Sequence, residues 1–182
     1  TAQSLRKVHS ADLDVYESPT VWPRAFFTDR IDHYDQPADF VAKARAATGR
    51  PFAAAQRSDA VAQAALAPIP SDAATRSVAP ATNYRLTENS TSFTVRASGP
   101  GVIVLNEVLW PGDFRAEVNG QKAAILRINH AFRGVVVTAA GDYRVTFVYR
   151  PKNYPRHLAL CGIGAVLGLG TFLLALRPVR RA

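Results

Sequence analysis

The sequence predicts a mainly β protein, namely an antiparallel β-sandwich with one or two short helices and a single C-terminal transmembrane helix. Seven short strand-like segments follow residue 83, with turn residues between them. Nineteen residues without a charge, Leu158 to Leu176, come near the end of the chain. We therefore expect an extracytoplasmic domain at 1–155, with an Ala/Pro-rich insertion at about 53–82, a membrane helix at 156–177 and a short basic cytoplasmic tail at 178–182.

The first third of the chain predicts short elements of both kinds. Leu5 to His9 and Leu13 to Glu17 alternate like strands. A helix is expected over Pro37 to Ala47, because proline suits a first turn and a glycine follows the segment. A second helix is expected from Ser58 or Asp59, as N-cap, to Leu66. Three prolines predict that the following segment, Ala67 to Thr82, is a loop or linker.

In the β-rich part of the chain, the turn-forming residues Gly, Pro and Asn recur between the expected strands. The expected strands are Tyr84 to Glu88, Phe93 to Ala97, Val102 to Leu109, Phe114 to Val118, Ala123 to Ile128, Gly134 to Thr138 and Tyr143 to Tyr149. Asn119-Gly120 predicts a type I′ hairpin, because both residue types accept positive φ. Apolar residues alternate with polar ones just before that turn, which predicts one buried and one wet face.

Composition limits the classes of partner and cofactor. The net charge is +8, but the basic residues are scattered and no aromatic–basic stacking motif appears, so nucleic acid is not expected as a partner. The four histidines are far apart, and Asp29, Asp32 and Asp35 form an acidic turn without the ligand number that calcium needs. No cofactor and no catalytic residue set are expected. Because the chain lacks Met, we expect either that a leader was removed or that a longer protein precedes Thr1.

The region around the apolar run predicts contacts with a membrane and with other helices. The tether to the helix is short, so membrane lipids should meet its aromatic and basic residues, Arg150, Lys152, Tyr154, Arg156 and His157. Small residues on one helix face predict close packing against another transmembrane subunit: Cys161, Gly164, Gly168, Thr171 and Ala175. The count of Lys and Arg on the two sides of the helix is a tie and leaves the orientation open.

Three residues of the β-rich region are candidate ligand or partner contacts. Trp110 precedes a Pro-Gly turn, where tryptophan usually anchors a corner of the core and less often forms a ligand platform. Arg115 and Arg133 lie in the segments that follow. A carbohydrate is one ligand class that such a tryptophan would suit.

Several motifs occur in an order that resembles a known family. They are Trp22-Pro-Arg-Ala-Phe26, Trp110-Pro-Gly-Asp-Phe-Arg-Ala-Glu-Val-Asn-Gly120, Asn129-His-Ala-Phe-Arg-Gly134 and Gly141-Asp-Tyr-Arg-Val-Thr-Phe-Val-Tyr-Arg-Pro151. They resemble the C-terminal region of YfhO-type bacterial membrane proteins, over about Leu5 to Leu176. The resemblance implies multi-span glycosyltransferases of the GT-C kind using lipid-linked sugars, with this β domain outside the cytoplasm. Asp113 stands where that family has tryptophan, and the many upstream spans are absent. The resemblance therefore predicts a fold and an orientation and no catalytic residue.

Three functional hypotheses follow. The first is a non-catalytic, single-pass accessory subunit of a larger complex in the bacterial cytoplasmic (inner) membrane, with its domain on the periplasmic or extracellular side. The second is the C-terminal fragment of a YfhO-like glycosyltransferase. The third is a stand-alone carbohydrate-binding module.

Overall fold

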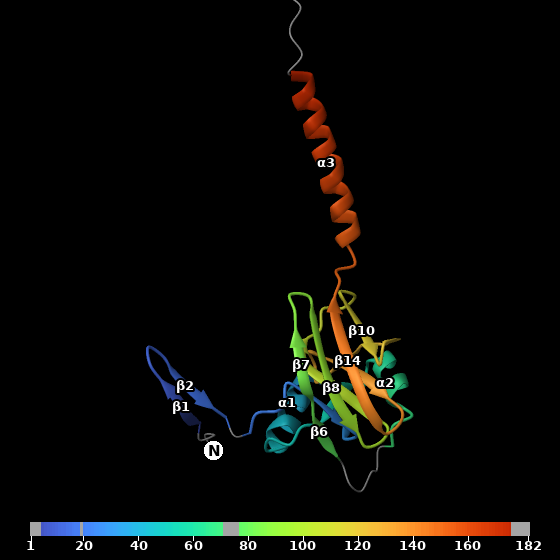
Figure 1. Cartoon of the computed structure of the whole chain (residues 1–182). Helices are drawn as coiled ribbons and strands as arrows, with labels where there is room; N and C mark the ends of the chain where they lie inside the picture. Colours follow the sequence, from blue (N-terminus) through green and yellow to red (C-terminus); the bar gives the residue numbers. More distant parts are fainter. Residues whose placement is uncertain (1–4, 19, 71–76, 176–182) are drawn as a thin grey trace, which may run out of the picture. The chain divides into compact units, whose positions relative to one another are not determined.

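The computed structural model describes residues 5–18, 20–70 and 77–175. The chain divides into two compact units, Thr1–Tyr149 and Arg150–Ala182 (Figure 1). The first unit is built mainly of antiparallel strands, and the second contains one long apolar helix. The predicted fold class is therefore confirmed. The predicted basic tail at 178–182 lies outside the described residues.

Two five-stranded antiparallel sheets form the sandwich. The first has the order β11-β10-β14-β8-β7 and the second has the order β12-β13-β9-β3-β6. The strands of the first sheet are β7 Thr82–Leu86, β8 Ser90–Ala97, β10 Phe114–Val118, β11 Gln121–Ala123 and β14 Gly141–Tyr149. Those of the second are β3 Ala25–Thr28, β6 Val78–Pro80, β9 Gly101–Val108, β12 Leu126–Ile128 and β13 Phe132–Val137.

The main core lies between the two sheets. Alternate side chains of each strand point inward, as the period of two requires. Phe93 and Phe147 from the first sheet pack with Ile103, Leu105 and Val135 from the second. Burial of these large apolar side chains is the main stabilising contribution to this unit.

The outer face of the second sheet is also buried. Val102, Val104 and Phe26 pack there against Ala55 and Leu66. The covering residues come from β5 Ala53–Gln56, which pairs in parallel with β4 Ile31–Tyr34, and from α2 Ala60–Leu66. Strand β9 is thus covered on both faces, which explains its continuous apolar run. The Ala-rich segment starting at residue 53 contributes this covering layer.

Both predicted short helices are present. Helix α1 spans Pro37–Ala46, and Thr48 and Gly49, which follow it, take the left-handed conformation that ends a helix. Helix α2 has Asp59 as its N-cap, where the Oδ1 accepts a 3.0 Å hydrogen bond from the Ala62 N–H. The Asn119-Gly120 hairpin is confirmed, since both residues have positive φ and Val118 faces Gln121.

Two sequence-based expectations are wrong. The single strand expected over Ala123 to Ile128 is two strands, β11 and β12, in different sheets, because the chain crosses between the sheets at the edge of the sandwich. The loop expected over Ala67 to Thr82 contains strand β6, which pairs with β3 at the edge of the second sheet. Proline is tolerated in such an edge strand because its missing N–H faces away from the ladder.

Candidate functional site

The β1–β2 hairpin, formed by β1 Arg6–Ser10 and β2 Asp14–Glu17, is a separate two-stranded sheet. Every residue of both strands is exposed, including Val8, Val15 and Tyr16, and Leu13 in the turn is 79% exposed. A lone two-stranded hairpin is marginally stable in water, because neither face is buried. This hairpin therefore presents apolar side chains and unpaired strand edges to its surroundings.

Polar pairs across the β1–β2 hairpin hold its register. Arg6 forms an ion pair with Glu17, and the Lys7 Nζ lies 2.8 Å from an Asp14 carboxylate oxygen. The Ser10 hydroxyl donates to the same carboxylate. Lys7 first, and then Ser10, hold the pKa of the Asp14 carboxyl below its ordinary value. Exposed pairs of this kind contribute little to stability, so they add little to the marginal stability of a two-stranded hairpin.

Helix α3, Tyr154–Ala175, is long and apolar enough to cross a membrane, and it is the only such helix among the described residues. All of its side chains are exposed. The predicted small-residue face comprises Cys161, Gly164, Gly168, Thr171 and Ala175, whose spacings of three and four residues place them along one side. An added Cβ at Gly164 or Gly168 would meet no atom within 4 Å. The Thr171 hydroxyl donates to the Gly168 carbonyl oxygen and so is satisfied within the helix.

The predicted membrane-surface residues lie at the start of the second unit. Arg150 and Lys152 fall in the four residues between β14 and α3, and Tyr154, Arg156 and His157 lie in the first turn of α3. All five are exposed. This composition, aromatic and basic at one end of an apolar helix, is typical of a membrane interface.

The three predicted ligand contacts have different environments. Trp110 is 63% exposed and follows β9, so its interpretation as an anchor of the core is wrong. Arg115 is exposed on the outer face of β10. Arg133 is only 4% exposed. Among the described residues, no hydrogen bond, ion pair or ring contact joins any two of the three side chains.

Arg133 belongs to an ionic cluster at the end of the core that sequence reasoning missed. Its guanidinium lies 3.9 Å from the centre of the Phe114 ring and forms an ion pair with Glu107. Glu107 also accepts hydrogen bonds of 2.7 and 3.0 Å from Arg24. Burial lowers the pKa of the Arg133 guanidinium, and the neighbouring Glu107 opposes that shift. The Arg133 guanidinium is thus paired with Glu107 within the fold.

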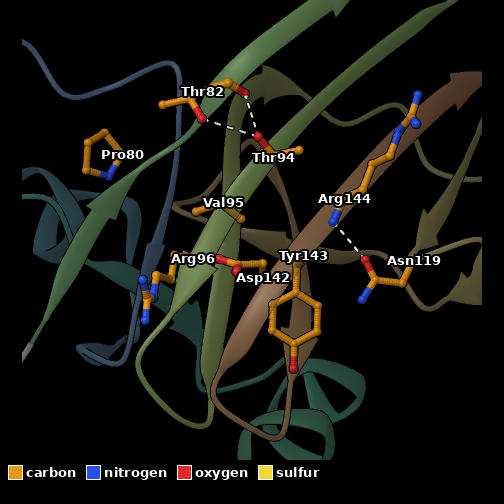
Figure 2. A pocket seen from close by; sticks show the side chains of 9 residues that line it. All are labelled: Pro80, Thr82, Thr94, Val95, Arg96, Asn119, Asp142, Tyr143 and Arg144. Atoms are coloured by element: carbon orange, nitrogen blue, oxygen red, sulfur yellow. Dashed lines mark hydrogen bonds between the residues drawn. The ribbon is translucent and has the colours of Figure 1, made fainter.

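An open pocket of about 510 Å³ lies on the outer face of the first sheet (Figure 2). We call this surface the polar face and define it by Thr82, Thr94, Arg96, Asn119, Asp142 and Arg144. Strand pairing places Asp142 opposite Arg96, and Arg144 opposite Thr94. The side chains of the polar face therefore project from neighbouring strands β7, β8 and β14, with Asn119 added from the turn after β10.

Part of the polar face is held by hydrogen bonds within the fold. The Thr82 and Thr94 hydroxyl oxygens are 3.2 Å apart, and the Asn83 amide donates to the Thr94 hydroxyl. The Asn119 side-chain oxygen accepts from the Arg144 backbone N–H (Figure 2). Within the described part of the chain, the Arg96 and Arg144 guanidinium groups and the Asp142 carboxylate have no hydrogen-bond or ion-pair partner. These three charged groups are available to a ligand.

The described residues include no group of three or more His, Cys, Asp or Glu side chains that could hold a metal ion. In the predicted acidic turn, Asp29 accepts hydrogen bonds from Ser77, and Asp32 lies within 4 Å of Arg30 and Lys43. These carboxylates therefore have partners inside the fold.

Comparison with protein-family models, with curated proteins and with solved structures finds no match for this chain. The resemblance to YfhO-type proteins remains a prediction from the sequence motifs.

Proposed function

We propose that this chain is a non-catalytic, membrane-anchored interaction module that serves as an accessory subunit of a larger membrane complex. The observation that carries the proposal is the β1–β2 hairpin, in which every strand residue is exposed. A contact surface on another protein would bury its apolar side chains and complete its strand edges.

Helix α3 supports the same proposal from the other end of the chain. Its apolar length suits a bilayer, and its small-residue face would allow a second helix to approach closely. Only four residues separate the last strand from the helix in the sequence. We therefore propose that the β-sandwich works at the membrane surface, in contact with lipid headgroups through Arg150, Lys152, Tyr154, Arg156 and His157.

The orientation and the membrane belong to the proposal as well. We place the domain on the periplasmic or extracellular side of a bacterial inner membrane, because the motif resemblance implies that side. A cysteine-labelling reagent that cannot cross the membrane should modify Lys122→Cys, which lies outside the proposed contact surface, in intact spheroplasts. Protection of this cysteine until the membrane is opened would contradict the orientation.

Site-specific photocrosslinking tests the interaction directly. A photoreactive amino acid at Leu13, in the β1–β2 hairpin, should give one discrete adduct with another membrane protein when native membranes are irradiated. The matched control is Lys122, which is exposed in the hairpin formed by β10 and β11, within a five-stranded sheet. The control position should give no such adduct.

The helix face provides the second arm of that experiment. Replacing Gly164 and Gly168 together by leucine should lower the yield of the Leu13 adduct, because the helix would no longer pack closely against its partner. Replacement of Leu169 by alanine is the control on the same helix. Equal adducts at Leu13 and Lys122, or an adduct unaffected by the glycine replacements, would contradict the accessory-subunit proposal.

A second candidate is the C-terminal part of a YfhO-like glycosyltransferase that uses a lipid-linked sugar. The order of the Trp22, Trp110, Asn129 and Gly141 motifs favours it. Reading the gene upstream of Thr1 distinguishes the two candidates. Several further hydrophobic spans in the same reading frame would support the transferase, and a short leader alone would exclude it.

A further inference from the structure

We propose that the polar face of the first sheet binds an acidic saccharide, with the Arg96 and Arg144 guanidinium groups donating to its anionic group and its hydroxyls and Asp142 accepting from its hydroxyls. This inference goes beyond the accessory-subunit proposal and does not depend on it. It rests on the pocket over β7, β8 and β14 and on the charged groups there that have no partner among the described residues.

The outer faces of the two sheets of the sandwich carry different kinds of side chain. The outer face of the second sheet is apolar and is covered by β5 and α2. The outer face of the first sheet carries charged and hydroxyl side chains, and its pocket lies over β8 and β14, which pair without interruption, and over the irregular start of β7. Because the sheet backbone is rigid, these side chains are held on a fixed scaffold, which favours recognition of a ligand.

The mixture of groups suits a polyhydroxylated ligand. A sugar hydroxyl both donates and accepts, so a saccharide site needs both kinds of group side by side. Here the Arg96 and Arg144 guanidinium groups can donate at opposite sides of the pocket, and the Asp142 carboxylate between them can accept (Figure 2). Asn119 offers its amide N–H groups near the Arg144 backbone. The volume of about 510 Å³ lies within the range of small-ligand sites.

The charge of the pocket favours an acidic saccharide over a neutral one. Two arginines and one aspartate line it, which leaves one positive charge in excess. The planar guanidinium fork matches carboxylate and phosphate groups with paired hydrogen bonds. Nucleic acid fits less well, because its single strands are held on stacking aromatic platforms. The one aromatic side chain in the lining, Tyr143, already donates its hydroxyl to the Ala139 carbonyl oxygen.

The test is calorimetric titration of the full chain in nanodiscs of uncharged phosphatidylcholine, prepared without sugar-based detergent. The probes are trigalacturonate and glucose 6-phosphate as acidic saccharides, maltotriose as a neutral saccharide, and inorganic phosphate as an anion without a sugar. We expect at least one acidic saccharide to bind at least about tenfold more tightly than maltotriose and phosphate, because the charged and hydroxyl contacts act together. The two acidic probes distinguish a carboxylate from a phosphate as the anion.

The variants are Arg96→Gln and Arg144→Gln, with Arg115→Gln as the matched control. Arg115 is exposed on the outer face of the same sheet but does not line the pocket. Each pocket variant should weaken binding by about tenfold through the loss of a charge-assisted contact, and the control should leave it unchanged. All three side chains are exposed, so the thermal unfolding of the domain should stay the same.

Four results would overturn the proposal. They are no binding of either acidic saccharide, equal binding of inorganic phosphate, equal binding of maltotriose, and equal weakening by Arg115→Gln. The second would show an adventitious anion site, and the last would show attraction by the overall positive charge. None of these results bears on the Leu13 crosslink, so this proposal and the accessory-subunit proposal can fail separately.

Discussion

The sandwich and the β1–β2 hairpin are made of the same kind of element but reach stability in different ways. In the sandwich, inward side chains such as Phe93, Val145 and Phe147 are fully or almost fully buried between two sheets. In the hairpin, Val8, Val15 and Tyr16 occupy comparable strand positions and remain exposed. Strand pairing alone therefore does not produce a stable unit, because burial supplies most of the favourable free energy.

The difference indicates which part of the molecule has a buried core of its own and which part has none. The sandwich buries an apolar core between its two sheets. The hairpin has charge pairs and a defined register but no core. The following predictions test this difference and the contacts that stabilise each part, from the largest expected effect to the smallest.

The largest contrast should come from removing an apolar side chain. Phe147→Ala should lower the free energy of unfolding by about 3–5 kcal/mol, because it leaves a cavity between the sheets. Val15→Ala, in the hairpin, should change it by less than about 0.5 kcal/mol. Denaturant unfolding of the full chain in nanodiscs, followed by tryptophan fluorescence, measures both, since Trp22 packs against Phe26 and Phe52. Equal losses would mean that the hairpin is integral to the folded unit.

The two ion pairs provide the second contrast. Glu107→Gln should lower the free energy of unfolding by about 2–4 kcal/mol, because it leaves the Arg133 guanidinium without its counter-charge in a largely buried site. Glu17→Gln breaks the exposed pair with Arg6 and should cost less than about 1 kcal/mol. The same unfolding experiment applies. A cost below about 1 kcal/mol for Glu107→Gln would contradict a structural role for the Arg133 cluster.

A buried amide should give the third effect. Asn129 is buried and its side chain joins two layers, donating to the Phe52 carbonyl oxygen and accepting from the Ala54 N–H. Asn129→Ala should lower the free energy of unfolding by about 1–3 kcal/mol, since the Ala54 N–H and the Phe52 carbonyl oxygen both lose their hydrogen-bond partner. Asn89→Ala, at an exposed turn, is the control. No difference between the two would show that β5 is not held by this residue.

The smallest effect should be a dependence of the stability of the β1–β2 hairpin on pH, which the sandwich should not share. The pKa of Asp14 is below its ordinary value of 3.8, so the folded hairpin favours the ionised carboxylate. This stabilisation is present above that ordinary value and is lost as the pH falls through the lowered pKa. NMR signals of the hairpin amides should therefore shift at low pH in the wild type. They should shift less in Asp14→Asn, and an unchanged profile would contradict the Lys7–Asp14 contact.

The sequence predicted the sandwich well where the local chemistry is unambiguous. The Asn119-Gly120 turn, the Asp59 N-cap and the alternation in β10 each depend on neighbouring residues only. The division of Ala123 to Ile128 between two sheets depends on how the two sheets pack on each other. The alternation of apolar and polar residues along the sequence does not contain that information. The same holds for β6, because an edge strand with a proline has the composition of a loop.

The candidate sites were less predictable, because they depend on which strands become neighbours. Arg133 appeared in the sequence as a free basic residue, and only the pairing of β13 with β9 brings it to Glu107. The polar face was not predicted, since Arg96 and Asp142 are far apart in the sequence and meet only through the pairing of β8 with β14. A sign of it was present in the polar positions that alternate with the core residues of both strands.

Amide hydrogen exchange of the β1–β2 hairpin tests the central claim most directly. Deuterium uptake over residues 6–17 should be compared between the purified chain in nanodiscs and the chain in its native membranes, with the β10–β11 hairpin as internal reference. The account predicts rapid exchange in the purified chain and at least about tenfold slower exchange in native membranes, because a partner would protect the strands. Equally rapid exchange in both samples would contradict it.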